Sequence, residues 1–289
     1  RSLSIVPEVD PATRALGLID VCGTGGDHQN TFNISTTVAI VVASAGIPVA
    51  KHGNRAITSR SGSADVLEAL GIQIDLDPAT AAAWLRTHHF AFFFAPRYHP
   101  AFKNIAPARK LCAKEGQRTL FNFLGPLLNP ARPDIQLVGV SQPALCEPLA
   151  RVLQSLGLRR AMVACGRAGA HYLDELSTVG ETTIADFHHE LGISLSTLSP
   201  HLFPIQPVTI RDLAVDDRES SAIVVSRILA GEDRGPKRDA TILNASAALF
   251  LCGRTKSLIE AWDLADELLD SGRASAKLGE LQQASRQNT

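Results

Sequence analysis

Residues 18–54 read LIDVCGTGGDHQNTFNISTTVAIVVASAGIPVAKHGN, and this stretch decides the fold. The apolar run at 18–22 predicts a short buried strand, and the run of small residues at 35–46 predicts a helix closed by a glycine. A second strand is predicted at 48–50, before the polar stretch 51–54. Strand, glycine-rich loop, helix and strand in this order are typical of a mostly parallel sheet.

The same alternation continues along the chain. Strands are predicted at 90–94, 135–140 and 160–165, and helices at 63–70, 79–87, 100–114 (interrupted at Pro107), 147–156, 218–229, 241–251 and 257–269. The proline-bearing segment 192–207 is predicted to be irregular. The sequence therefore predicts an α/β fold with a mostly parallel central sheet flanked by helices.

Composition limits the classes of function. A chain of 289 residues with a formal net charge of −1 has no overall attraction to nucleic acid or to anionic lipid. The sequence has no long apolar run and no signal-peptide pattern, so no membrane partner is expected. The five cysteines lack CxxC spacing, which favours reduced thiols and a cytoplasmic location. Any phosphate must therefore be bound by a local site.

The loop Gly23-Thr24-Gly25-Gly26-Asp27 is the first candidate for such a site. Its glycines let backbone N–H groups approach phosphate oxygens closely, and the helix that begins after Asn33 adds a positive dipole end. A tight turn before an ordinary helix cap is an equally frequent alternative for glycines in this pattern. The loop has neither Walker nor GxGxxG spacing, which argues against ATP hydrolysis and against NAD.

Other polar residues follow predicted strands and should gather at the same edge of the sheet. Lys51 could contact phosphate, and His52 and Asn54 could bind a second ligand, although turn chemistry around Gly53 explains them equally well. Asp174 and Glu175 suit Mg²⁺, which binds carboxylates together with substrate phosphate; a solvated acidic pair is the alternative. His99 and Arg109 are candidate substrate contacts, and the guanidinium of Arg109 could pair with a carboxylate.

Taken together, these motifs resemble those of the anthranilate phosphoribosyltransferases. The resemblance covers nearly the whole chain, and the motifs in this order are highly specific. It rests on GTGGD (23–27) with TFNIST (31–36), KHGNR (51–55), FAPRYHPA (94–101) with Arg109, TLFNFLGPLLNP (119–130), the pair Asp174-Glu175 and the segment 244–246.

The resemblance implies transfer of the phosphoribosyl group from phosphoribosyl pyrophosphate to anthranilate, in tryptophan biosynthesis. It implies that phosphoribosyl pyrophosphate is held by Gly23, Thr24, Gly25, Gly26, Asp27, Thr31, Asn33, Ser35, Thr36, Lys51, Ser59 and Ser63. It assigns anthranilate to Gly23, His52, Asn54, His99 and Arg109, and Mg²⁺ to Ser35, Asp174 and Glu175. No general acid or base is expected; positioning and electrostatics carry the reaction, with Lys51 and Arg109 contributing.

The sequence departs from the family pattern in a few places. His28 stands where the family usually has glycine, and Phe102 where it often has tyrosine. Residues 1–17 are expected to be a remnant of a small N-terminal helical subdomain that is otherwise missing, before an α/β domain at 18–289. Because that subdomain usually supplies the dimer contact, a homodimer is expected for the intact protein and is in doubt for this chain.

Two alternatives stay open at this point. A pyrimidine nucleoside phosphorylase would perform related chemistry with phosphate, but it would not need the pair Asp174-Glu175. A non-catalytic relative that binds nucleic acid would need a local basic surface.

Overall fold

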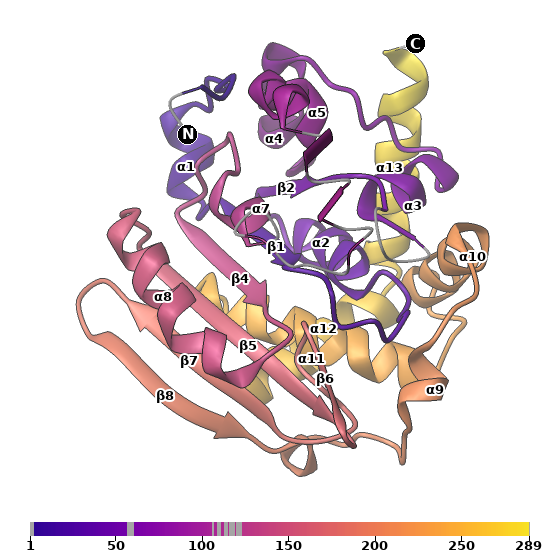
Figure 1. Cartoon of the computed structure of the whole chain (residues 1–289). Helices are drawn as coiled ribbons and strands as arrows, with labels where there is room; N and C mark the ends of the chain where they lie inside the picture. The colour runs from indigo at the N-terminus through magenta and orange to yellow at the C-terminus, as the bar shows by residue number, and fades with distance from the viewer. Residues whose placement is uncertain are drawn as a thin grey trace.

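The computed structural model describes residues 3–56, 61–105, 107–108, 111–112, 115, 119 and 123–288. An eight-stranded sheet runs through the molecule in the order β3-β2-β1-β4-β5-β7-β8, with β6 paired to β5 (Figure 1). The strands are β1 (Ile19–Gly23), β2 (Val49–Gly53), β3 (Phe90–Phe94), β4 (Ile135–Gly139), β5 (Arg160–Ala168), β6 (His171–Leu173), β7 (Thr182–His188) and β8 (Gly192–Leu198). The pairs from β3 to β5 are parallel, and β6, β7 and β8 are added antiparallel.

Helices cover both faces of this sheet. The longer ones are α2 (Ile34–Ser44), α3 (Ser63–Ala69), α4 (Pro78–His88), α8 (Cys146–Ser155), α10 (Arg218–Leu229), α11 (Pro236–Leu251), α12 (Leu258–Asp270) and α13 (Arg273–Gln287). The short ones are α1 (Pro11–Ala15), α5 (Ala95–Tyr98), α7 (Leu124–Leu127) and α9 (Ile210–Leu213), with 3-10 turns η1 (Pro100–Asn104), η3 (Pro143–Leu145) and η4 (Pro200–Leu202). The predicted α/β fold with its mostly parallel sheet is confirmed.

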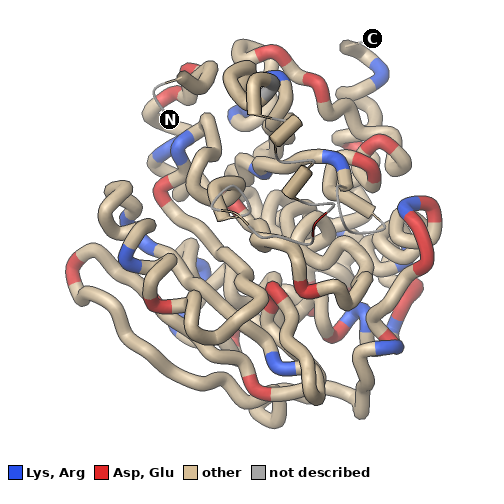
Figure 2. Tube along the Cα trace, viewed as in Figure 1, with Lys and Arg blue, Asp and Glu red and all other residues tan. Residues whose placement is uncertain are grey.

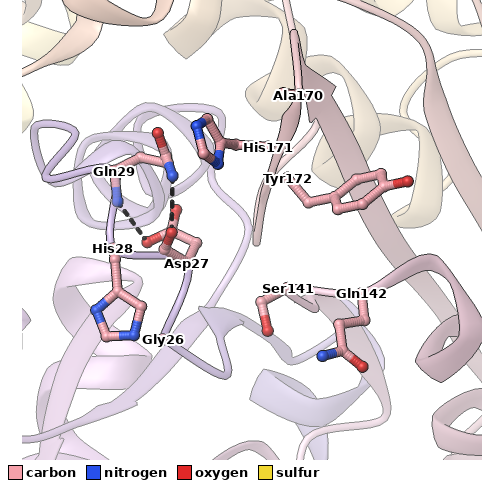
Figure 3. A pocket seen from close by; sticks show the side chains of 9 residues that line it. All are labelled: Gly26, Asp27, His28, Gln29, Ser141, Gln142, Ala170, His171 and Tyr172. Atoms are coloured by element: carbon pink, nitrogen blue, oxygen red, sulfur yellow. Dashed lines mark hydrogen bonds between the residues drawn. The ribbon is translucent and has the colours of Figure 1, made fainter.

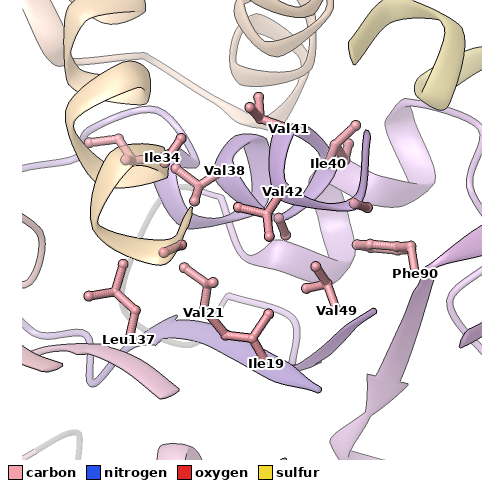
Figure 4. Packing of buried hydrophobic residues seen from close by; sticks show 14 of the residues in the cluster. Ile19, Val21, Ile34, Val38, Ile40, Val41, Val42, Val49, Phe90 and Leu137 are labelled. Atoms are coloured by element: carbon pink, nitrogen blue, oxygen red, sulfur yellow. The ribbon is translucent and has the colours of Figure 1, made fainter. Parts of the chain in front are cut away.

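The sheet separates two apolar layers. On one face, α2 and α11 pack on the strands, and Figure 4 shows Val38 and Val42 of α2 above Val21 and Leu137 of the sheet. On the other face, α8 packs on β5 and β7. Successive residues of β4 and β5 enter opposite layers because side chains alternate along a strand. These central strands are therefore buried on both faces, as their continuous apolar runs require.

The local structure differs from the prediction in four of its elements. The segment 192–207 is not irregular, because Gly192–Leu198 forms the edge strand β8. Its side chains are largely exposed, so the strand lacks the apolar alternation that would identify it. Helix α11 begins at Pro236, five residues before the predicted start at 241, and helix α13 was not predicted. Within the predicted helix 100–114, Pro100–Asn104 is a 3-10 turn, and much of the remainder lies outside the described residues.

Two further observations bear on organisation. The N-terminal residues contact the main body: the Ile5 amide donates to the Tyr98 carbonyl, and Arg14 donates to the carbonyls of Ala131 and Arg132. The proposed division at residue 17 stays a prediction. Across the described part of the chain, no helix is long and apolar enough to cross a bilayer. Figure 2 shows acidic and basic segments interspersed along the trace.

Candidate active site

The glycine-rich loop leaves the carboxyl end of β1 and turns back over the sheet. The amide of Thr24 donates to the Gly139 carbonyl at 2.9 Å, which ties the loop to the end of β4. Gly25 and Gly26 have φ of 72° and 80°, the left-handed region in which glycine carries no steric penalty. The Gly25 amide donates to Asp174 Oδ2 at 2.7 Å. The loop is therefore shaped around a carboxylate.

Two glycines make room for Asp174. A Cβ on Gly23 would lie 2.1 Å from Asp174 Oδ2, and a Cβ on Gly139 would lie 1.5 Å from the Asp174 carbonyl oxygen. Both separations are shorter than any contact between unbonded atoms, so a side chain at either position would displace the acid. The ends of β1 and β4 thus require glycine because the segment after β6 crosses them. Gly23 was predicted as a substrate contact, and this steric role is an additional one.

A buried asparagine of α11 fixes the segment that carries the two acids. Asn244 accepts from the Leu176 amide at 2.9 Å and donates to the Leu176 carbonyl at 3.0 Å. Its amide group therefore satisfies both backbone polar groups of the residue that follows Glu175. Asn244 was noted in the sequence only as part of a motif, because nothing in its helical context indicates that it faces a loop.

The carboxylates of this segment are crowded by negative charge. Burial raises the pKa of Asp174 to about 7, with Asp27 adding to the rise and the Gly25 amide opposing it. Burial also raises the pKa of Glu175, assisted by Asp174, whereas Lys51 and the Ser35 amide oppose that rise. Asp27, Asp174 and Glu175 thus converge beside the glycine loop, and a cation placed among them would relieve their repulsion.

The first turn of α2 brings further predicted residues to this place. Asn33 precedes the helix and is held by Ser221, whose hydroxyl donates to Asn33 Oδ1 at 2.8 Å while its oxygen accepts from the Asn33 amide. Ser35 is half-buried, and its hydroxyl accepts from Lys51 Nζ at 3.2 Å. Thr36 is fully buried, and its Oγ1 has no hydrogen-bond partner among the described residues.

Lys51 is buried under the site. Its side chain is 1% exposed, and Nζ also donates to the Val21 carbonyl at 2.7 Å. Burial lowers the pKa of Lys51, and the attraction of Asp20 opposes that change. Asp20 is itself fully buried and accepts from Asn129 at 2.8 Å. The ammonium of Lys51 therefore contacts the first turn of α2 through the Ser35 hydroxyl and places positive charge beneath that turn.

The other predicted substrate residues lie in two places. Thr31 forms an isolated bridge with Ala214, and Ser63 Oγ donates to the Asn54 carbonyl at 3.4 Å beside Gly53, where a Cβ would lie 2.2 Å from that hydroxyl. Asn54 Oδ1 accepts from the Arg55 amide. Ser59 and Arg109 lie outside the described residues, so their predicted roles stay predictions.

The two predicted histidine contacts bind each other. The Nε2 atoms of His52 and His99 lie 3.1 Å apart, and both residues are buried. The remaining ring nitrogen of His52 lies 3.0 Å from the Gly125 carbonyl oxygen, and that of His99 lies 2.9 Å from Ser4 Oγ. Every ring nitrogen of the pair is therefore already hydrogen-bonded within the protein.

A cavity of about 300 Å³ lies along the outer edge of the loop (Figure 3). It is lined by Gly26, Asp27, His28, Gln29, Ser141, Gln142, Ala170, His171 and Tyr172. His28 has φ of 59°, so the histidine that replaces the expected glycine occupies a left-handed conformation. Histidine tolerates this region better than most residues, which explains how the turn survives the replacement.

The donor set fits a hard cation shared with a ligand. Among the described residues, no three His, Cys, Asp or Glu side chains are arranged to hold a metal by themselves. Mg²⁺ prefers one or two carboxylates and completes its shell with water and substrate phosphate. The crowded pair Asp174 and Glu175, facing a loop of backbone donors, matches that requirement.

Comparison with known proteins identifies the lineage. A family model described as "Glycosyl transferase family, a/b domain" matches residues 16–275. The anthranilate phosphoribosyltransferase of Herpetosiphon aurantiacus is 45% identical over 269 residues, which are 93% of this chain and 78% of that protein. The chain belongs to the anthranilate phosphoribosyltransferase family.

Solved structures of anthranilate phosphoribosyltransferases agree with this assignment. The enzyme of Thermus thermophilus superposes with a TM-score of 0.86 at 37% identity, covering 98% of this chain and 80% of that one. The Saccharomyces cerevisiae enzyme, in complex with phosphoribosyl pyrophosphate and Mg, superposes with a TM-score of 0.87 at 27% identity, covering 99% and 77%. A further structure of the yeast enzyme holds 4-fluoroanthranilate. The chain is thus a pentosyltransferase, as the sequence predicted.

Proposed function

We propose that this chain transfers the phosphoribosyl group of phosphoribosyl pyrophosphate to the amine of anthranilate and releases pyrophosphate. The observation that carries the proposal is the enclosure of Asp174 by the glycine loop, with Glu175 at the first turn of α2. This arrangement combines backbone donors, a helix terminus and two carboxylates in one place, as a magnesium-bound diphosphate requires.

Different residues of the site would bind the phosphate groups and the Mg²⁺ ion. The amides of the loop and the first turn of α2 would donate to phosphate oxygens, and Ser35 would add its hydroxyl. Lys51 would stabilise that anionic group from beneath, through Ser35. Asp174, Glu175 and Ser35 would hold Mg²⁺, which supplies neutralisation of the charge that builds up on pyrophosphate as it leaves.

The reaction needs little proton transfer at the start. A neutral aromatic amine attacks the anomeric carbon of ribose as the bond to pyrophosphate breaks, so the barrier depends on placing the two substrates and on stabilising the leaving group. Alignment can contribute roughly 7–11 kcal/mol in favourable cases. The amine then loses a proton, which pyrophosphate or water can accept. Asn54 and Arg109 stay the predicted contacts of anthranilate, and the predicted dimer stays a prediction.

The test is identification of the products. The purified chain is incubated with phosphoribosyl pyrophosphate and Mg²⁺, either with anthranilate or with isomeric aminobenzoates, and separately with thymidine and phosphate. We expect phosphoribosyl anthranilate and pyrophosphate in equal amounts, at a rate highest for the ortho isomer. Release of thymine in the last reaction, with no anthranilate product in the first, would establish a nucleoside phosphorylase instead. Salt-sensitive binding of single-stranded DNA without any turnover would establish a non-catalytic relative.

A further inference from the structure

A continuous chain of hydrogen bonds joins the two histidines that the sequence predicts as anthranilate contacts to Ser4 and Gly125. It runs from Ser4 Oγ to His99 Nδ1 over 2.9 Å, from His99 Nε2 to His52 Nε2 over 3.1 Å, and from His52 Nδ1 to the Gly125 carbonyl over 3.0 Å. The two rings meet edge to face, with centroids 5.0 Å apart. Both histidines are buried, so water does not substitute for these partners.

The chain has one self-consistent direction. A carbonyl oxygen only accepts, so His52 Nδ1 must carry the proton that it donates to Gly125. His52 is held neutral, because burial first and His99 second lower its pKa to about 3. Its Nε2 is then an acceptor, and His99 must donate from Nε2. Burial also lowers the pKa of His99, and the Leu128 carbonyl opposes that change. A neutral His99 ring that donates from Nε2 leaves Nδ1 to accept from the Ser4 hydroxyl.

The far end of this chain is the Gly125 carbonyl, which lies in the short helix α7. Three side chains fix the segment around this helix: His52 donates to Gly125, Gln136 donates to the Pro126 carbonyl at 2.8 Å, and Asn129 donates to the Ala50 carbonyl at 2.7 Å. Gln136 belongs to the central strand β4, and both Gln136 and Asn129 are 1% exposed. His52 is 8% exposed and lies near the carboxyl end of β2, so it is the least buried of the three.

We propose that His99 is a positioning residue, which fixes the tautomer of His52 and through it holds the segment around Gly125 against the acceptor site. On this proposal neither histidine donates a hydrogen bond to anthranilate, which replaces the direct contacts expected from the sequence. The effect on anthranilate rests on the proposed function, whereas the tautomers are a property of the protein without substrate. The tautomer assignment and the proposed function can therefore be disproved independently of each other.

The first experiment measures the tautomers directly. The full chain, labelled with ¹⁵N at histidine, is examined without substrate by long-range ¹H–¹⁵N correlation at neutral pH, and the signals are assigned with single histidine variants. We expect a neutral Nδ1–H ring for His52 and a neutral Nε2–H ring for His99. An Nε2–H ring at His52, or a charged ring at either position, would overturn the proposal whatever reaction the protein catalyses.

The second experiment separates positioning from contact. Leucine at His99 removes the donor to His52, whereas glutamine presents an amide N–H close to the place of Nε2. We expect His99→Leu to raise the KM for anthranilate by about tenfold or more, since a buried acceptor is left unpaired, with a much smaller change for phosphoribosyl pyrophosphate. His99→Gln should restore most of the affinity. The exposed His201 provides the control, and His201→Leu should change neither constant.

Two kinetic outcomes contradict the positioning role. If His99→Gln is as impaired as His99→Leu, the imidazole itself touches the substrate. If His99→Leu raises both KM values equally, the residue supports the whole site rather than its acceptor side. A leucine variant that does not fold leaves the tautomer measurement, made on the unaltered chain, to decide.

Discussion

Asp174 is an enclosed acidic residue at the glycine loop. Its carboxylate is enclosed by the Gly25 amide on one side and by the absent side chain of Gly23 on the other, and Asp27 faces the same space. A carboxylate in such surroundings holds its proton to a higher pH than a free one. The energetic cost of ionising it is present in the protein without ligands, and a bound divalent cation would offset that cost.

This crowding predicts a pH dependence of stability. Because the pKa of Asp174 in the folded chain is about 7, above its ordinary value of 3.8, the folded state binds more protons than the unfolded state between these limits. Stability contributed by this group is therefore lost as pH rises from about 4 to about 7. Asp174→Asn retains an acceptor for Gly25 and removes the titration. Relative to the parent, the variant should gain about 4 kcal/mol in free energy of unfolding between pH 4 and pH 8, because each unit of pKa shift corresponds to about 1.4 kcal/mol.

Denaturant unfolding of both proteins at several pH values, without Mg²⁺, measures this difference. Taking the difference cancels the opposite contributions of His52 and His99, whose pKa values are lowered. The rise that Asp174 causes in the pKa of Glu175 does not cancel and is part of the measured difference. A difference in free energy of unfolding that stays constant across the pH range would show that Asp174 has an ordinary pKa and that the neighbouring acids do not raise it. Added Mg²⁺ should stabilise the parent at pH 8 and leave Asp174→Asn unchanged.

At the scale of elements, α11 positions the acids of the site although it contributes none of them. Asn244 binds both the amide and the carbonyl of Leu176. Through these two bonds, helix α11 fixes the position of the loop that carries Asp174 and Glu175. Asn244→Ala leaves a buried N–H and a buried carbonyl without partners, so we expect a loss of about 2–3 kcal/mol in free energy of unfolding and a large drop in turnover.

Ser246 supplies the matched control. It is fully buried on the same helix, but its hydroxyl donates only to the Ile242 carbonyl of that helix. Ser246→Ala should cost less than about 1 kcal/mol and retain turnover. Equal losses in both variants, measured by thermal unfolding and initial rates, would mean that the bridge to Leu176 has no special role.

The parallel half of the sheet could be predicted from the sequence, and the antiparallel half could not. Strands such as 90–94 and 135–140 are buried on both faces and appear as continuous apolar runs, whereas β8 is an exposed edge strand whose residues 192–198 include serines and a threonine. The glycine loop was identified because close backbone approach requires glycine. The pairing of His52 with His99 was missed because two residues 47 positions apart become neighbours only through the order of β2 and β3.

At the scale of the whole molecule, the sheet order explains why distant motifs form one site. The carboxyl ends of β1, β2 and β4 lie side by side in the centre of the sheet, and β6 brings Asp174 back over them (Figure 1). Each motif is weak evidence of function alone, because glycine turns, acidic pairs and buried histidines are common. Their convergence at the carboxyl ends of these central strands, in a member of this enzyme family, is what supports a magnesium-dependent phosphoribosyl transfer.

The central claim is that the loop and the two acids hold a magnesium-bound diphosphate, and Mg²⁺-dependent pyrophosphate release tests it most directly. Initial rates with phosphoribosyl pyrophosphate and anthranilate are measured over a range of Mg²⁺ concentrations for the parent chain and for Glu175→Gln. We expect rates that depend on Mg²⁺ in the parent, and a tenfold or greater increase in the half-saturating Mg²⁺ concentration in the variant. The same Mg²⁺ dependence in both proteins, or full release without Mg²⁺, would contradict the account.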